Sequence, residues 1–195
     1  MGAFFSSFDE AWSFFLGRTE PLEDFFAEFP DDDDACVEGW MVEPPAEIKA
    51  AAHRLQEALA QVTWLVPVPD HFLHVAIGLS DRIGDVAEEW EDLEAFPITY
   101  ANVNCFHAAV VVEVEGPMSQ LVAGTPYDDS TFLPHMTLAV ARQRAPPAEL
   151  REVLATVRDA VLGRQVVDLL TCVRFPAGRS TLFRPWSVER LVSLR

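Results

Sequence analysis

Two stretches of the sequence place a histidine and a small residue two positions apart within an apolar run. His74 and Ala76 occupy these positions in the first stretch, and His135 and Thr137 in the second. Imidazole has an ordinary pKa near neutral pH, so one ring can accept a proton while another donates one. The hydroxyl of Thr137 can donate a hydrogen bond to a phosphoryl oxygen held between the rings. These residue types suit in-line attack on a phosphodiester without a metal ion.

Period-two alternation predicts that both stretches are β-strands. His74, Ala76 and Gly78 then share one face of the first strand, and His135 and Thr137 share one face of the second. The intervening residues are apolar, so the opposite face of each strand can pack under helices. Two such strands lining one cleft would bring both imidazoles to a single bound group.

The two stretches resemble the paired His-x-Thr/Ser motifs of the 2H phosphoesterase superfamily, which includes the 2′-5′ RNA ligase-like proteins. Residues 134–138 match the second motif, and residues 73–77 keep the histidine of the first. The resemblance covers residues 36–195. It implies an α+β fold in which two pseudo-symmetric lobes, each an antiparallel sheet with helices, surround a central cleft. It also implies a metal-independent phosphodiesterase that acts on a 2′,3′-cyclic phosphate, an RNA end or a small cyclic nucleotide, without a cofactor.

Ala76 departs from the motif, which has a hydroxyl residue at this position. A hydrogen bond to a charged group contributes about 1.5–3 kcal/mol, which corresponds to roughly ten- to a hundred-fold in rate. A general acid or base contributes about 10²–10⁴-fold. The change therefore fits a weakened enzyme, a binding module that has lost its chemistry, or a different pose of the phosphate. Gly78, two positions on, would let a ligand approach closely.

Other residues are candidates for binding the rest of a substrate. Arg174, Arg179 and Arg184 lie in a predicted C-terminal hairpin and could bind phosphate. Tyr127 precedes the second motif and could stack on a base, although a surface tyrosine is the simpler interpretation. We expect no metal ligands.

Charge is distributed unevenly along the 195 residues, whose net charge is −17. Residues 1–134 contain 26 acidic and four basic residues, whereas residues 135–195 contain ten arginines and five acids. An acidic body repels long nucleic acids, whose non-specific binding is mainly electrostatic. A small nucleotide or an RNA end is therefore a better expected partner than a long duplex.

The first 34 residues are predicted to form an acidic, Phe-rich helical extension of a domain at 35–195. Its apolar residues recur at helical spacing, with Phe4, Phe8, Trp12 and Phe15 among them. Such a stripe can pack on the protein's own core, on a second copy or on another partner. Arg18 is the only basic residue before Lys49, which argues against binding to an anionic membrane surface.

Several features predict a cytoplasmic protein that is not embedded in a membrane. Half of the residues are apolar, as in a globular domain, but no run of about 18 apolar residues occurs. The N-terminus lacks the basic region of a signal peptide. The three cysteines form no Cys-x-x-Cys motif, so we expect them to be reduced and buried.

The remaining pattern predicts how strands and helices alternate around the two motifs. Besides the motif strands, we expect strands at 35–42, 98–106, 108–115, 166–175, 181–186 and 188–194, and helices at 46–62, 88–96 and 146–162.

Overall fold

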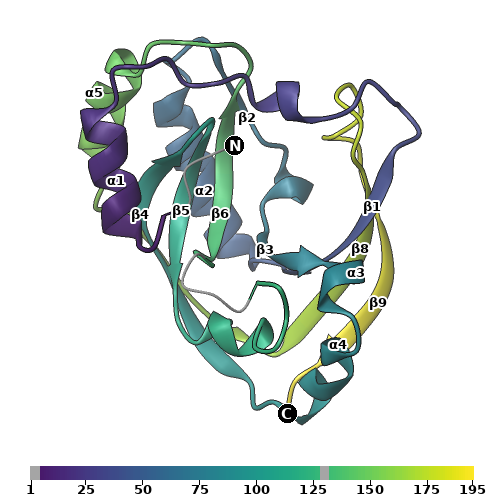
Figure 1. The fold of residues 1–195 in the computed structure, drawn as a ribbon. Coiled ribbons are helices and arrows are strands. Elements are labelled where there is room, and N and C mark those ends of the chain that lie inside the picture. The colour runs from purple at the N-terminus through teal and green to yellow at the C-terminus, as the bar shows by residue number, and fades with distance from the viewer. Residues whose placement is uncertain (1–4, 128–131) are drawn as a thin grey trace.

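A computed structural model describes residues 5–127 and 132–195. Its main feature is an antiparallel sheet with the order β7-β4-β5-β6-β3-β1-β8-β9, to which β2 is added beside β6 (Figure 1). The strands are β1 Cys36–Val42, β2 Leu65–Pro67, β3 Val75–Leu79, β4 Phe96–Phe106, β5 Ala109–Glu115, β6 His135–Ala141, β7 Val161–Val167, β8 Leu169–Pro176 and β9 Ser187–Ser193. The expected α+β fold is thus confirmed, with its two lobes joined in one continuous sheet.

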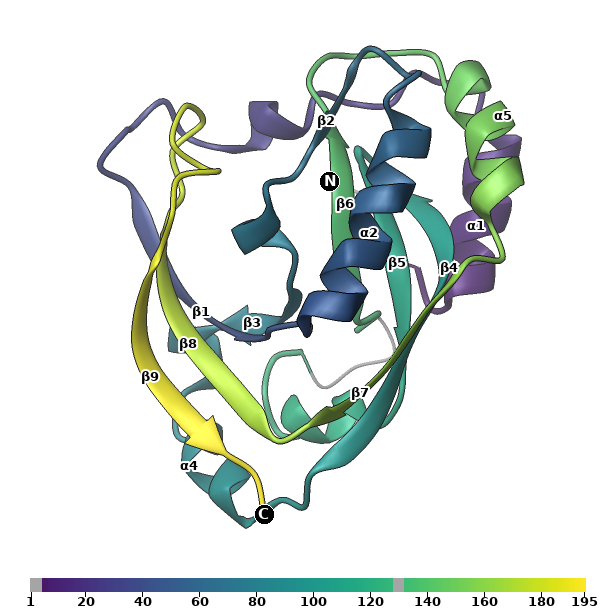
Figure 2. The same ribbon diagram turned by 180° about the vertical axis from the view of Figure 1, so that it is seen from behind.

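The α-helices are fewer than the strands within the described ranges. They are α1 Phe8–Gly17, α2 Ala46–Leu59, α3 Ser80–Ile83, α4 Val86–Glu89 and α5 Ala148–Val157, with short 3₁₀ turns η1 Phe25–Glu28, η2 Asp70–Phe72, η3 Trp90–Asp92 and η4 Met118–Leu121. Figure 2 shows α2 crossing one face of the sheet in front of β5 and β6. The helix buries Ile48, Ala52 and Leu59 on its inner side, as its apolar spacing predicts.

The two halves of the sheet meet at β3 and β6. Between these two strands, both of which the structure describes in full, only Val75 and Met136 are paired, so the halves can diverge on either side of this contact. Val75, Ile77, Met136 and Leu138 are all at most 2 % exposed. Their burial confirms the predicted apolar face of both motif strands and leaves the histidines on the other face.

The N-terminal extension packs on the fold. Phe15 and Leu22 are 2 % and 1 % exposed, and Leu22 forms an isolated bridge with Ala145. Figures 1 and 2 both show α1 lying beside α5 and β4. Arg151 of α5 donates hydrogen bonds to the carbonyl oxygens of Phe15 and Arg18. In the described part of the extension, helical structure is confined to α1 and η1, and Phe4 lies outside the described residues.

Three predictions of secondary structure were wrong in part. The helix expected at 146–162 ends at Val157, because the β-branched residues from Val161 onward pair with β4 as the separate strand β7. Residues 88–96 form short turns and the start of β4 rather than one helix. Residues 181–186 form turns rather than a strand, as the hydrogen bond from the Arg184 N–H to the Thr181 carbonyl shows.

Two further findings concern the surface. Cys36 is exposed, contrary to expectation, while Cys105 and Cys172 are buried, and none of the three is in a disulfide. No helix within residues 5–127 and 132–195 is long and apolar enough to cross a membrane.

Candidate functional site

His74 and His135 lie on one face of the sheet, where its two halves meet. Val75 pairs with Met136 in antiparallel register. One step to either side of this pair, His74 therefore neighbours Thr137, and Ala76 neighbours His135. The two histidines are diagonal neighbours, a relation that places backbone positions roughly 7–8 Å apart and within reach of long side chains. This register makes His74, His135 and Thr137 neighbours where the two halves of the sheet meet.

The two imidazoles are held by the same type of hydrogen bond. Nδ1 of His74 lies 2.7 Å from the Phe72 carbonyl oxygen, and Nδ1 of His135 lies 2.7 Å from the Leu133 carbonyl oxygen. A carbonyl only accepts, so Nδ1 carries the proton in each ring. In the neutral ring, Nε2 therefore has a free lone pair. Each histidine is oriented by the residue two positions before it, and each can accept a proton at Nε2.

Burial keeps both imidazoles uncharged in the free protein. Burial is the main reason that the pKa of His74 falls from 6.5 to about 4, and the neighbouring His135 contributes to this lowering. Burial also lowers the pKa of His135. Both rings are consequently proton acceptors at neutral pH. An anionic phosphate between them would favour the charged form of a ring and so allow one of them to become an acid.

Aromatic side chains surround the histidines. Phe72 and Trp186 meet the His74 ring edge to face, with centroids 5.1 Å and 5.3 Å away. Phe106 meets the His135 ring in the same way at 5.0 Å. These contacts restrict both imidazoles and account for part of their desolvation.

A cavity of about 260 Å³ opens beside His74 and Ala76. Its lining is Gly39, Trp40, Met41, Phe72, His74, Ala76, Gly78, Leu79, Tyr127, Val173, Phe175 and Trp186. The lining is mainly apolar, so the cavity suits an uncharged group rather than a second phosphate.

Gly78 lines this cavity and also makes room for the ring of Tyr127. A Cβ at this position would lie 2.5 Å from a ring carbon of Tyr127. The Tyr127 hydroxyl oxygen accepts a hydrogen bond of 3.2 Å from the Leu79 N–H. Tyr127, from the loop before β6, thus crosses to the other half of the sheet and forms one wall of the cavity.

The structure pairs two of the three candidate arginines with carboxylates. Arg174 forms an ion pair of 3.8 Å with Glu38, on the opposite face of β8 from Val173 and Phe175, which line the cavity. Arg179 forms an ion pair of 3.3 Å with Asp31 and holds the N-terminal extension. Arg184 is exposed on the turns that lead to Trp186.

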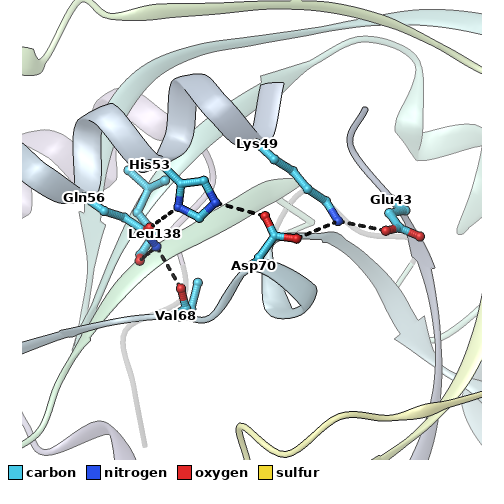
Figure 3. Close-up of polar contacts among 7 residues, drawn as sticks. All are labelled: Glu43, Lys49, His53, Gln56, Val68, Asp70 and Leu138. Atoms are coloured by element: carbon cyan, nitrogen blue, oxygen red, sulfur yellow. Dashed lines mark hydrogen bonds and ion pairs between the residues drawn. The ribbon is translucent and has the colours of Figure 1, made fainter. Parts of the chain in front are cut away.

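Gln56 links the two segments that carry His74 and His135 (Figure 3). The sequence had not indicated this role for Gln56. Its Nε2 donates to the carbonyl oxygens of Val68 and Leu138, at 2.9 Å and 2.8 Å. Val68 leads into η2 and His74, whereas Leu138 lies on β6 three residues after His135. Helix α2 therefore ties both segments together from behind the sheet.

His53 extends this network to η2. Because the Gln56 amide nitrogen donates to two carbonyls, its Oε1 accepts from His53 Nδ1 at 2.9 Å. His53 Nε2 lies 2.9 Å from Asp70 Oδ1, and a carboxylate only accepts. Both ring nitrogens are thus donors, and these hydrogen bonds, mainly the one to Asp70 and then the one to Gln56, raise the pKa of His53. Lys49 completes the network, 3.7 Å from Asp70 and 2.8 Å from Glu43.

Glu113 is a second polar residue that the sequence analysis missed. It pairs with His135 across β5 and β6 and is 3 % exposed. Arg158 and Asn104 bind its Oε1 at 2.6 Å and 2.7 Å. The signal in the sequence was a glutamate within an otherwise apolar strand, and its buried ion pair fills the sheet face beside His135. No group of three or more potential metal ligands occurs among the described residues.

Comparison with known proteins supports the fold. No family model matches the sequence, and no curated protein matches it. The protein TT0787 of Thermus thermophilus is similar in structure, with a TM-score of 0.61 and 20% identity over 82% of this chain and 98% of that one. E. coli LigT in complex with 3′-AMP has a TM-score of 0.56 and 16% identity, covering 90% and 99% of the two chains. A crystal structure described as a phosphoesterase has a TM-score of 0.56 and 14% identity, covering 82% and 99%. These likenesses confirm the fold that the paired histidine motifs predicted.

Proposed function

We propose that this protein is a phosphodiesterase of the 2H type that hydrolyses a 2′,3′-cyclic phosphate of a nucleotide or RNA end. The observation that supports this proposal is the pair of imidazoles on one sheet face. Each imidazole donates a hydrogen bond from Nδ1 to a backbone carbonyl oxygen, which leaves Nε2 to accept or donate the catalytic proton. The likeness of the fold to LigT and to a phosphoesterase structure also supports it.

The chemistry follows from the two Nε2 atoms. One imidazole removes a proton from water as the water oxygen forms its bond to phosphorus. The bond from phosphorus to the leaving ester oxygen breaks, and the other imidazole, protonated in the presence of the anion, donates a proton to that oxygen. Thr137 donates a hydrogen bond to a phosphoryl oxygen, whose negative charge increases in the transition state. The two imidazoles carry out both proton transfers, so the mechanism requires no metal ion.

A second candidate function is binding of a nucleotide or RNA end without turnover. Ala76 favours this alternative, because the first motif lacks the hydroxyl that would bind the phosphate from the other side. The rest of the proposed machinery remains, which is why hydrolysis is our first proposal.

Hydrolysis of a 2′,3′-cyclic nucleotide in the presence of a metal chelator separates the two functions. We expect turnover that the chelator does not change and that His135→Ala abolishes. Binding of the nucleotide without turnover would identify a binding module, and loss of activity on chelation would contradict the metal-independent mechanism.

A further inference from the structure

We infer that the site is one-sided: it accepts a phosphate ester with a single uncharged ring group, such as one nucleoside, beside His74, and excludes a diester whose second nucleoside would extend past His135. This inference rests on the proposed function for the position of the phosphate between the two imidazoles. It assigns the remainder of the substrate and selects among the substrates that the motifs leave open.

The cavity beside His74 has the size and lining for one ring system. Its volume of about 260 Å³ is just below the roughly 300–1,000 Å³ typical of pockets for drug-sized ligands. Phe72, Tyr127, Phe175 and Trp186 supply aromatic walls, and no lysine or arginine is among the described residues that line it. A planar, uncharged group can pack there, whereas a second phosphate would lose its solvation without finding a cation.

The walls of this cavity are continuous with the proposed phosphate position. Trp186 contacts the His74 ring at a centroid distance of 5.3 Å, and Ala76 shares the face with His74. The methyl group of Ala76 extends the apolar wall, so the residue that breaks the motif belongs to the ring pocket. The Tyr127 hydroxyl oxygen accepts a hydrogen bond from the Leu79 N–H. The hydroxyl proton therefore remains available for a hydrogen bond to a ligand.

The face on the His135 side is occupied by the N-terminal extension. Phe106 contacts the His135 ring, and Phe8 of α1 stacks on Phe106 with a centroid distance of 6.0 Å and an interplanar angle of 10°. Phe5 packs against the same ring and is 7 % exposed. Asn104 donates a hydrogen bond of 3.0 Å to the Phe8 carbonyl oxygen. Helix α1 thus fills the surface along which a second nucleotide would extend.

The charged side chains near the histidines also disfavour a longer substrate on the His135 side. The cation next to this face, Arg158, is bound to the buried carboxylate of Glu113 and packs over Trp12. Arg174 and Arg179 are paired with acids away from the histidines. Further phosphates past His135 would therefore approach a protein with a net charge of −17, which opposes their binding.

Equilibrium binding to the full chain tests this inference without depending on turnover. The probes are a mononucleotide in the form of its phosphate methyl ester, inorganic phosphate, and the dinucleoside monophosphate in which a second nucleoside replaces the methyl group, all at one ionic strength. We expect the mononucleotide to bind at least about ten-fold more tightly than either other probe, because only it fills the ring pocket without entering the α1 side.

Substitutions of Trp186 test the ring pocket directly. Trp186→Ala should weaken mononucleotide binding by about ten-fold or more and phosphate binding much less, because the mononucleotide loses stacking on an aromatic side chain, whereas phosphate loses only the support that Trp186 gives to His74. Trp186→Phe should retain most of the affinity. Trp12→Ala, a matched change on α1 away from the cavity, should alter neither affinity. Trp186 is half-buried on a turn, and thermal unfolding checks that each variant is folded.

The outcomes distinguish this inference from the proposed function. Tight mononucleotide binding without hydrolysis of its cyclic form would support the one-sided site and contradict the phosphodiesterase. Equal affinity for the mononucleotide and the dinucleoside monophosphate would overturn the one-sided site and leave the phosphodiesterase intact. Unchanged mononucleotide affinity in Trp186→Ala would also overturn it.

Discussion

His74 and His135 differ from ordinary histidines in having lowered pKa values before any substrate arrives. The free-protein pKa is about 4 for His74 and below the usual 6.5 for His135, mainly because of burial. The mechanism needs one ring neutral and one protonated. The required combination is lost as pH falls through the pKa of the base and as pH rises through that of the acid. We predict that kcat/KM, which reports the free enzyme, is greatest below pH 6.5. A pH profile with its maximum above neutrality would contradict the lowered pKa values.

Thr137 provides the one motif hydroxyl, since the other motif has Ala76. Thr137→Ala should lower kcat/KM by about ten- to a hundred-fold, because a hydrogen bond to a charged oxygen contributes about 1.5–3 kcal/mol. Thr137→Ser keeps the hydroxyl and is the control, with activity near that of the wild type. Equal loss in both variants would indicate that the threonine methyl group, and not the hydroxyl, is what matters.

At the scale of elements, α2 holds β6 and the segment before β3 through Gln56. Gln56→Leu removes its two hydrogen bonds to the Val68 and Leu138 carbonyl oxygens. We predict a loss of stability of about 1–3 kcal/mol from the unsatisfied carbonyls. Because a small misplacement of catalytic groups is costly, kcat should fall by up to about a hundred-fold. Urea unfolding and steady-state kinetics measure the two effects.

Gln61→Leu is the matched control on the turn that follows α2, since Gln61 binds the nearby Ala58 carbonyl oxygen and not the histidine segments. It should change neither quantity. A Gln56→Leu protein that is less stable but has unchanged kcat would limit the role of Gln56 to stability.

The same elements show what sequence patterns can reveal. Alternation placed His74 and His135 correctly, because in both strands the opposite face is uniformly apolar and buried. Alternation did not guide the choice of Arg174, which was a candidate because of its place in the predicted C-terminal hairpin, and β8 presents Val173 and Phe175, not Arg174, to the cavity. Gln56 could not be found, because its partners are backbone carbonyls distant in sequence, which carry no side-chain signal.

For the whole molecule, the N-terminal extension is part of the folded unit. Phe15 of α1 is 2 % exposed, whereas Phe14 on the same helix is 43 % exposed. Phe15→Ala should therefore reduce the free energy of unfolding by about 3–5 kcal/mol, as expected for a large buried side chain. Phe14→Ala should have a much smaller effect. Similar values for the two variants in chemical unfolding would mean that α1 is not docked as described.

The central claim is that His74 and His135 act on one phosphate as a unit, and the kcat of their single and double alanine variants tests it most directly. With a 2′,3′-cyclic nucleotide as substrate, each single variant should lose at least about a hundred-fold. The double variant should be little worse than either single one, because residues that act together are not additive. Full activity in either single variant, or losses that multiply in the double variant, would contradict a shared site.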